Sequence, residues 1–175
     1  MIPIEIRPLI GIEIEGVGCI NLGHTKTDIE QILRLPKPID INRSVYCDEY
    51  ELRIDFDHSG VVEFIEFIYG PFPKRTSLAL FGINPFQLEA NKLVEFLREK
   101  NNDEVDDKNG EYHYFFKNIG ISVWRDNTEQ EALEMIERLK AEGEGKENEE
   151  WVKEDLERSK YFWTIAVCLP DYYSK

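Results

Sequence analysis

The chain has 175 residues and a mass of 20.6 kDa, with 42% hydrophobic and 32% charged residues. This composition is typical of a globular protein, and a chain of this length buries about 70% of its unfolded surface without disulfide or metal support. The 35 acidic and 21 basic residues give a formal net charge of −14. Such a surface repels phosphate backbones and anionic lipid, so we expect no nucleic-acid or membrane partner and instead a basic protein partner.

The cysteines and the N-terminal segment bear on the cellular compartment. Cys19, Cys47 and Cys168 stand in apolar stretches without a C-x-x-C pair, which indicates reduced, buried thiols. Residues 1–7 include Glu5 and do not resemble a signal peptide. No stretch approaches the ~20 apolar residues of a membrane span. We therefore expect a cytoplasmic protein.

Alternating apolar residues predict strands along the first half of the chain. The alternation of isoleucine over 2–6 and 10–14 predicts two strands, the first at a sheet edge because of Pro3 and Pro8. Strand pattern returns from Val45 and continues over 52–56, with a turn at 57–60. The stretch 61–69 is apolar on both faces and predicts a central strand that is covered on each side.

Helix-capping patterns divide the chain into two similar cycles. Thr25 and Asp28 have the spacing of a capping box, followed by an apolar helical stripe. Asn84 and Gln87 repeat this spacing, with Pro85 at the first helical position. The first helix precedes the strands from Val45 to residue 69, and the second precedes strands over 112–117, 119–125 and 161–169.

The predicted fold class is therefore α+β, with two tandem helix-plus-antiparallel-sheet units. The first unit covers 1–70 with an N-terminal hairpin, and the second covers 76–175, with Pro71 and Pro73 at the boundary. We expect the two units to form one compact structural domain. A helical, acidic insertion over 128–158 interrupts the second unit, where Thr128 and Glu131 form another capping box and Gly143 and Gly145 break the helix.

One metal-binding motif occurs, but its context argues against a metal. The D-x-D-x-S-G-x5-E spacing of a calcium loop is matched by Asp55, Asp57, Ser59, Gly60 and Glu66. A calcium loop of this type needs a helix on each side, whereas both flanks here alternate as strands. We therefore interpret the segment as a hairpin and expect no metal and no cofactor.

No catalytic motif is recognisable in the chain. It lacks G-x-S-x-G, H-E-x-x-H and a phosphate-binding glycine loop, and its three histidines, His24, His58 and His113, are scattered singly. We therefore expect no enzyme activity and assign no catalytic residue. The alternative that stays open is a small enzyme or ligand-binding domain with a pocket between two sheets.

The acidic insertion carries a large part of the total charge. Residues 128–158 contain 12 acids and 5 bases, a net charge of −7. One interpretation is a solvated helical face. The other is a docking surface for a basic protein, in which the acids speed the encounter and Trp151 is an aromatic anchor.

The run from Leu22 to Pro36 resembles a known pattern. Gly23, Thr25, Ile29, Leu33 and Pro36 match the G-x-T-x-x-x-[VI]-x-x-x-L-G-x-P signature of BamE-like lipoproteins and β-lactamase-inhibitory-protein-like domains, while Arg34 replaces the usual glycine. The resemblance implies tandem units that grip another protein. A small, acidic, cytoplasmic protein of this kind is similar to the immunity proteins of bacterial contact-dependent and polymorphic toxin systems.

This resemblance implies an immunity protein that blocks a toxin domain, expected to be a basic nuclease from a neighbouring gene, by covering its active site. The residues that we predict to bind the toxin lie in two acidic patches. They are Glu147, Glu149, Glu150, Trp151, Glu154 and Asp155 in the insertion, and Asp103, Glu104, Asp106 and Asp107 in the preceding loop.

Overall fold

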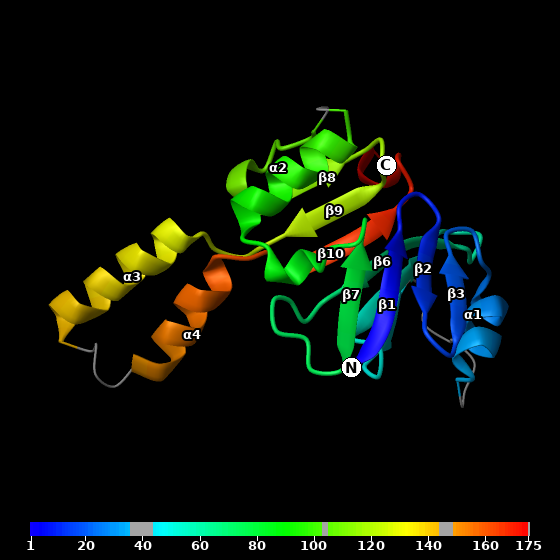
Figure 1. Cartoon of the computed structure of the whole chain (residues 1–175), viewed down its shortest axis with the longest axis horizontal. Helices are drawn as coiled ribbons and strands as arrows, with labels where there is room; N and C mark the ends of the chain where they lie inside the picture. Colours follow the sequence, from blue (N-terminus) through cyan, green and yellow to red (C-terminus); the bar gives the residue numbers. More distant parts are fainter. Residues whose placement is uncertain (36–43, 103–104, 144–148, 175) are drawn as a thin grey trace.

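The computed structural model describes residues 1–35, 44–102, 105–143 and 149–174. Two sheets face each other in the body of the molecule, and two helices project from it as an arm (Figure 1). The chain is an α+β protein with mostly antiparallel strands, as the sequence predicts.

The smaller sheet has the strand order β3-β2-β1-β7. Its only parallel pair is β1 with β7; the other described pairs are antiparallel. The larger sheet has the order β4-β5-β6-β10-β9-β8, and all its described pairs are antiparallel. The strands are β1 (Ile2–Arg7), β2 (Gly11–Ile14), β3 (Gly18–Asn21), β4 (Ser44–Cys47), β5 (Leu52–Phe56), β6 (Val62–Phe67), β7 (Thr76–Leu80), β8 (His113–Phe116), β9 (Ile121–Trp124) and β10 (Thr164–Cys168).

Four α-helices and three short 3-10 helices complete the described part of the chain. They are α1 (Lys26–Leu33), η1 (Pro85–Gln87), α2 (Ala90–Lys100), η2 (Gly110–Tyr112), α3 (Glu129–Glu142), α4 (Glu149–Ser159) and η3 (Tyr172–Ser174). The predicted capping boxes at Thr25 and Thr128 are confirmed. Each hydroxyl accepts a hydrogen bond from the backbone N–H three residues on, and the carboxylate at that position accepts one from the backbone N–H of the threonine.

The larger sheet consists of two meanders that meet at the β6–β10 pair. One meander, β4-β5-β6, follows α1, and the other, β8-β9-β10, follows α2, with α3 and α4 inserted between β9 and β10. The smaller sheet also mixes the two halves, because β7 pairs with β1. The division into units 1–70 and 76–175 stays a prediction.

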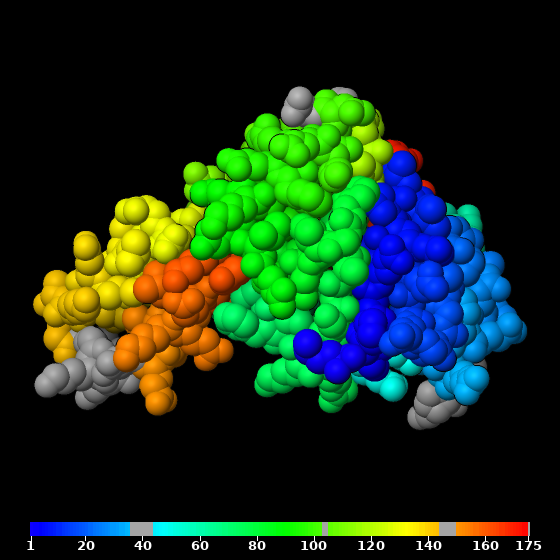
Figure 2. All heavy atoms as spheres, in the orientation of Figure 1, coloured from blue at the N-terminus to red at the C-terminus, as the bar shows by residue number. Residues whose placement is uncertain are grey.

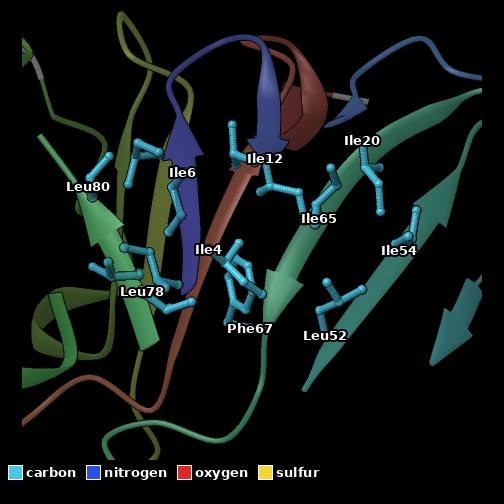
Figure 3. Packing of buried hydrophobic residues seen from close by; sticks show 14 of the residues in the cluster. Ile4, Ile6, Ile12, Ile20, Leu52, Ile54, Ile65, Phe67, Leu78 and Leu80 are labelled. Carbon is cyan, nitrogen blue, oxygen red and sulfur yellow. The ribbon is translucent and has the colours of Figure 1, made fainter. Parts of the chain in front are cut away.

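The core lies between the two sheets and is made mainly of branched aliphatic residues (Figure 3). Alternation along each strand sends one set of side chains inward, so Ile4 and Ile6 of β1 meet Ile65 and Phe67 of β6 in one cluster. Side chains therefore fill the space between the sheets in the described structure. The open pocket described below lies on the opposite face of the larger sheet, not between the sheets as in the alternative interpretation.

The prediction of an edge position for the first strand is wrong, because β1 lies between β2 and β7. Pro3 removes one donor, but its carbonyl still accepts a hydrogen bond from the backbone N–H of Glu15. The backbone groups of successive residues in a central strand hydrogen-bond alternately to the two neighbouring strands. One proline therefore removes a single donor and leaves most of the backbone hydrogen bonds of β1 intact. Pro8 lies beyond the strand, in the turn before β2.

The prediction of one helix beginning at Asn84 is also wrong. The Asn84 side chain accepts a hydrogen bond from the backbone N–H of Phe86, but this cap begins only η1. Leu88 is extended and separates η1 from α2. The separation lets the Phe86 ring pack so closely on Gly70 that a Cβ there would come within 2.3 Å of the ring.

Candidate functional site

The arm formed by α3 and α4 is the first candidate site. The Thr128 capping box starts α3, and Gly143 ends it in a left-handed conformation. The two helices pack on each other and stand clear of the body (Figures 1 and 2). Leu133 remains 42% exposed and Trp151 45% exposed. The arm therefore presents apolar surface among acidic side chains.

The arm is anchored firmly where it leaves the larger sheet. Arg125, which is buried, donates from Nε to the carbonyl of Glu111 at 2.8 Å and from Nη1 to the carbonyl of Ser159 at 3.4 Å. The Tyr112 hydroxyl bonds to the Glu131 carboxylate of α3. These contacts connect both helices to η2 and the end of β9, so the orientation of the arm is set by the sheet.

The structure brings together the described residues of the first predicted patch. Four of its residues lie on α4: Glu150, Trp151, Glu154 and Asp155. All of them are exposed except Asp155, which is partly buried. Asp155 has a structural contact as well, since its Oδ2 accepts a hydrogen bond from Asn127 Nδ2 at 2.9 Å. Glu149 is the first residue of α4. Glu147 lies outside the described residues.

The second predicted patch does not lie on the arm. Asp106 and Asp107 belong to the loop before β8, where Asp106 pairs with Lys108 at 3.1 Å and Asp107 with Arg98 at 3.5 Å. The backbone of Asp106 also pairs with Phe115 of the edge strand. Each carboxylate therefore lies beside a cation, while the backbone of the loop pairs with the sheet edge. Asp103 and Glu104 lie outside the described residues.

The second candidate site is an open pocket of about 570 Å³ on the outer face of the larger sheet. The strand register places Arg53, Glu66, Ala166 and Ser122 in one row across β5, β6, β10 and β9. Because side chains alternate between faces, all four point away from the core. Three residues of this row, Arg53, Glu66 and Ser122, line the pocket.

Two C-terminal tyrosines cover part of this outer face. The ring of Tyr172 stacks on Phe64 with 4.5 Å between centroids, and its hydroxyl donates to Asp55 Oδ2 at 3.1 Å. The ring of Tyr173 lies 5.0 Å from Phe115 and 4.8 Å from His113. These contacts cover the small apolar cluster of Phe64, Phe115, Ala166 and Cys168.

A hydrogen-bonded network runs through the pocket wall. The Ser122 hydroxyl lies 2.9 Å from His113 Nε2 and 2.9 Å from the Tyr173 hydroxyl. Burial lowers the pKa of His113, and the charge of Asp106 only partly opposes this. A serine beside a neutral histidine has the elements of an activated nucleophile. Ser122 is only 3% exposed, however, and its oxygen is shared between two partners, so the geometry favours a positioning role over catalysis.

The calcium-like motif forms a hairpin with separate roles for its carboxylates. Asp57 Oδ1 accepts hydrogen bonds from the backbone N–H groups of Ser59 and Val61, which closes the turn between β5 and β6. Asp55 instead pairs with Arg53 and Tyr172. Among the described residues, no group of three or more His, Cys, Asp or Glu side chains is placed to hold a metal ion.

The three cysteines form no disulfide, and Cys168 lies in the apolar cluster beneath the pocket. Cys47 and Cys168 are buried as predicted, whereas Cys19 is only partly buried, so the prediction is wrong for this residue. Burial raises the pKa of Cys47 to about 11 and that of Cys168 to about 12. Both thiols therefore stay protonated near neutral pH and are poor nucleophiles.

Comparisons of the chain with protein-family models, curated proteins and solved structures found no match. Within the described ranges, none of the helices combines the length and the apolar character that crossing a membrane requires.

The pocket was missed at the sequence level, although part of its signal was visible. Arg53 and Asp55 stand on the polar face of an alternating strand, which indicates a second, non-core surface. The contributions of Tyr172 and Tyr173 could not be recognised in this way, because they depend on where the C-terminal segment crosses the sheet.

Proposed function

We propose that this chain is an immunity protein that binds a basic bacterial toxin domain, such as a nuclease, and blocks its active site. The observation that carries the proposal is the arm, in which an acidic two-helix hairpin exposes Leu133 and Trp151. A solvated helical face would not need to expose a large aromatic ring. Apolar anchors surrounded by charge are typical of protein interfaces.

Charge supports a basic partner. The arm and its connection, residues 128–158, carry a net charge of −7, half of the −14 of the whole chain. Toxin nucleases bind phosphate backbones and are correspondingly basic, so the arm is complementary to their substrate site. An inhibitor of this kind needs no chemistry of its own and would act in the cytoplasm, where the toxin would otherwise reach its substrate.

The proposal predicts that charge on the arm controls the association rate. Replacing Glu150 and Glu154 by lysine changes the net charge from −14 to −10, since each substitution adds two charges. Electrostatic steering raises association rates from roughly 10⁵–10⁶ to about 10⁸ M⁻¹s⁻¹ at low salt, and salt screens it over about 10 Å at 0.1 M. The double variant should therefore associate more slowly and with a weaker dependence on salt.

The matched control is the double substitution Glu5→Lys and Glu15→Lys, which makes the same change in net charge on exposed residues of the smaller sheet and its adjoining turn. The measurement is stopped-flow or surface-based kinetics with the toxin domain encoded beside this gene, together with rescue of growth in cells that express the toxin. Equal effects of both double variants would refute docking on the arm. Absence of any binding or rescue would refute the immunity function.

The aromatic anchor should act on dissociation. Trp151→Ala removes an exposed ring whose burial in an interface is typically worth about 2 kcal/mol, which corresponds to roughly a 30-fold faster dissociation. Leu9→Ala, at an exposed position in the turn between β1 and β2, is the control. An unchanged dissociation rate for Trp151→Ala would remove this residue from the interface.

A further inference from the structure

The pocket on the outer face of the larger sheet has one cation and two carboxylates at its floor. The Arg53 guanidinium lies 3.3 Å from a Glu66 oxygen and 3.2 Å from an Asp55 oxygen, so one cation is shared by two carboxylates. His113 adds no positive charge near neutral pH, because burial lowers its pKa. With both carboxylates ionised, Arg53, Asp55 and Glu66 sum to −1. Burial raises the pKa of Glu66, and the neighbouring Arg53 guanidinium opposes this rise.

This charge balance disfavours an anionic ligand. An anion would have to compete with two carboxylates for a guanidinium that is already engaged on both sides. A cation would instead meet the surplus negative charge, and the Glu66 side chain lines the pocket. The floor therefore selects for positive charge.

The walls of the pocket are aromatic. Five rings line it, from Phe64, Tyr112, Trp124, Tyr172 and Tyr173, and Trp124 is 39% exposed. Aromatic faces attract ammonium and guanidinium groups through the ring quadrupole. The protein already uses this attraction in the same pocket, where the Arg53 guanidinium lies 5.3 Å from the centre of the Phe64 ring.

We propose that this pocket receives one cationic side chain, arginine or lysine, from a basic protein partner. The inference rests on the proposed function, since the side chain would belong to the partner that docks on the arm. The two sites adjoin each other: Trp124 ends β9, from which the chain continues into α3, and Tyr112 bonds to Glu131 of α3.

The pocket can be tested without the partner. The full chain would be titrated with N-acetyl-arginine amide, and with N-acetyl-citrulline amide as a neutral probe of nearly the same shape. The readout is the indole N–H resonance of Trp124, assigned by its loss in Trp124→Phe. We expect a saturable shift with the arginine probe and at least about fivefold weaker binding of the citrulline probe.

Glu66→Gln should weaken binding of the arginine probe by about fivefold, because it removes the carboxylate but keeps the size of the side chain. Glu13→Gln, at an exposed position of the smaller sheet, is the control and should leave binding unchanged. Thermal unfolding of each variant checks that the fold is retained, and Glu66→Asp, which keeps the charge, should restore part of the affinity. If Glu66→Gln unfolds the protein, the comparison of the two probes still decides the question.

Equal binding of the arginine and citrulline probes, or no shift with either, would overturn the pocket assignment. These outcomes are separate from those that test the arm. Absence of any toxin binding or rescue by the wild-type chain would refute the proposed function even if the probe binds beside Trp124, and normal partner binding by the arm charge-reversal variant would refute docking on the arm. Normal partner binding by Trp124→Ala, with the arm variant impaired, would refute only the role of the pocket in docking.

Discussion

Replacing Glu51 by alanine should lower the free energy of unfolding by about 3 kcal/mol. The Glu51 carboxylate precedes β5 of the larger sheet and accepts four hydrogen bonds from the start of β7 in the smaller one. The backbone N–H groups of Lys74, Arg75 and Thr76 donate at 2.7, 3.1 and 3.0 Å, and the Thr76 hydroxyl donates at 2.7 Å. This side chain therefore joins the two sheets.

The magnitude follows from the burial of the donors. Lys74 and Arg75 are exposed, so their N–H groups can bond to water in the variant. Thr76 is 1% exposed, and both of its donors lose their partner inside the protein. An unsatisfied buried donor costs about 1–3 kcal/mol, which gives about 3 kcal/mol for the pair. For a domain of this size the melting temperature should fall by about 6–12 °C.

The same contacts predict a dependence on pH. Burial alone would raise the pKa of Glu51, but the hydrogen bonds from Thr76, Lys74 and Arg75 outweigh it and lower the pKa below its ordinary value. A depressed carboxyl pKa stabilises the fold fully above the unfolded value of about 4.3, and this contribution is lost as the pH falls through the folded value. The difference between wild type and Glu51→Ala should thus shrink below about pH 4.

The assay is urea unfolding at pH 7 and at a series of acidic values, followed by circular dichroism. Glu49→Ala, at an exposed neighbouring position, is the control and should change stability by less than about 0.5 kcal/mol. Glu51→Gln keeps one acceptor oxygen and should fall between wild type and Glu51→Ala. Equal stability of Glu51→Ala and Glu49→Ala at pH 7 would refute the reasoning.

Three further outcomes follow from local structure. Thr25→Ala should lower the free energy of unfolding in urea by about 1 kcal/mol, because it removes the N-cap of α1. Thr27→Ala, at the second residue of the helix, removes no cap and should cost less; an equal loss in both variants would contradict the cap. Arg34 ends α1 with φ of 50°, so Arg34→Gly should raise stability by about 1 kcal/mol, and a lower unfolding midpoint would show that its side chain matters more than its backbone. Because Asp57 is engaged in the hairpin turn, millimolar calcium should leave the melting temperature unchanged; a saturable increase would show a metal site.

Local patterns predicted the elements whose signals lie within a few residues. The capping boxes at Thr25 and Thr128 need only a hydroxyl and an acid three residues apart, and both formed. The central position of β6 followed from apolar residues on both of its faces, and the structure places it between β5 and β10. Arg34 stands in the left-handed conformation at the position where the sequence departs from the glycine of the resembling pattern.

Features that depend on distant pairing could not be predicted in this way. The strands β3 and β7 were missed, because each is short and gains its stability from pairing with β2 or β1. The edge assignment of β1 failed for the same reason, since a proline does not reveal how many neighbours a strand has. Phe86 left the expected helix because its ring packs on Gly70.

The amino-acid sequence by itself determined the α+β class, the starts of α1 and α3 and the acidic character of the insertion, since these depend on composition, on period and on short-range hydrogen bonds. Only the tertiary structure decided that α3 and α4 stand away from the body, and that β5, β6, β10 and β9 align Arg53, Glu66 and Ser122 in one row under the C-terminal tyrosines. Residues 53 and 122 become neighbours in this row through three successive strand pairings, and no local pattern encodes which strands pair.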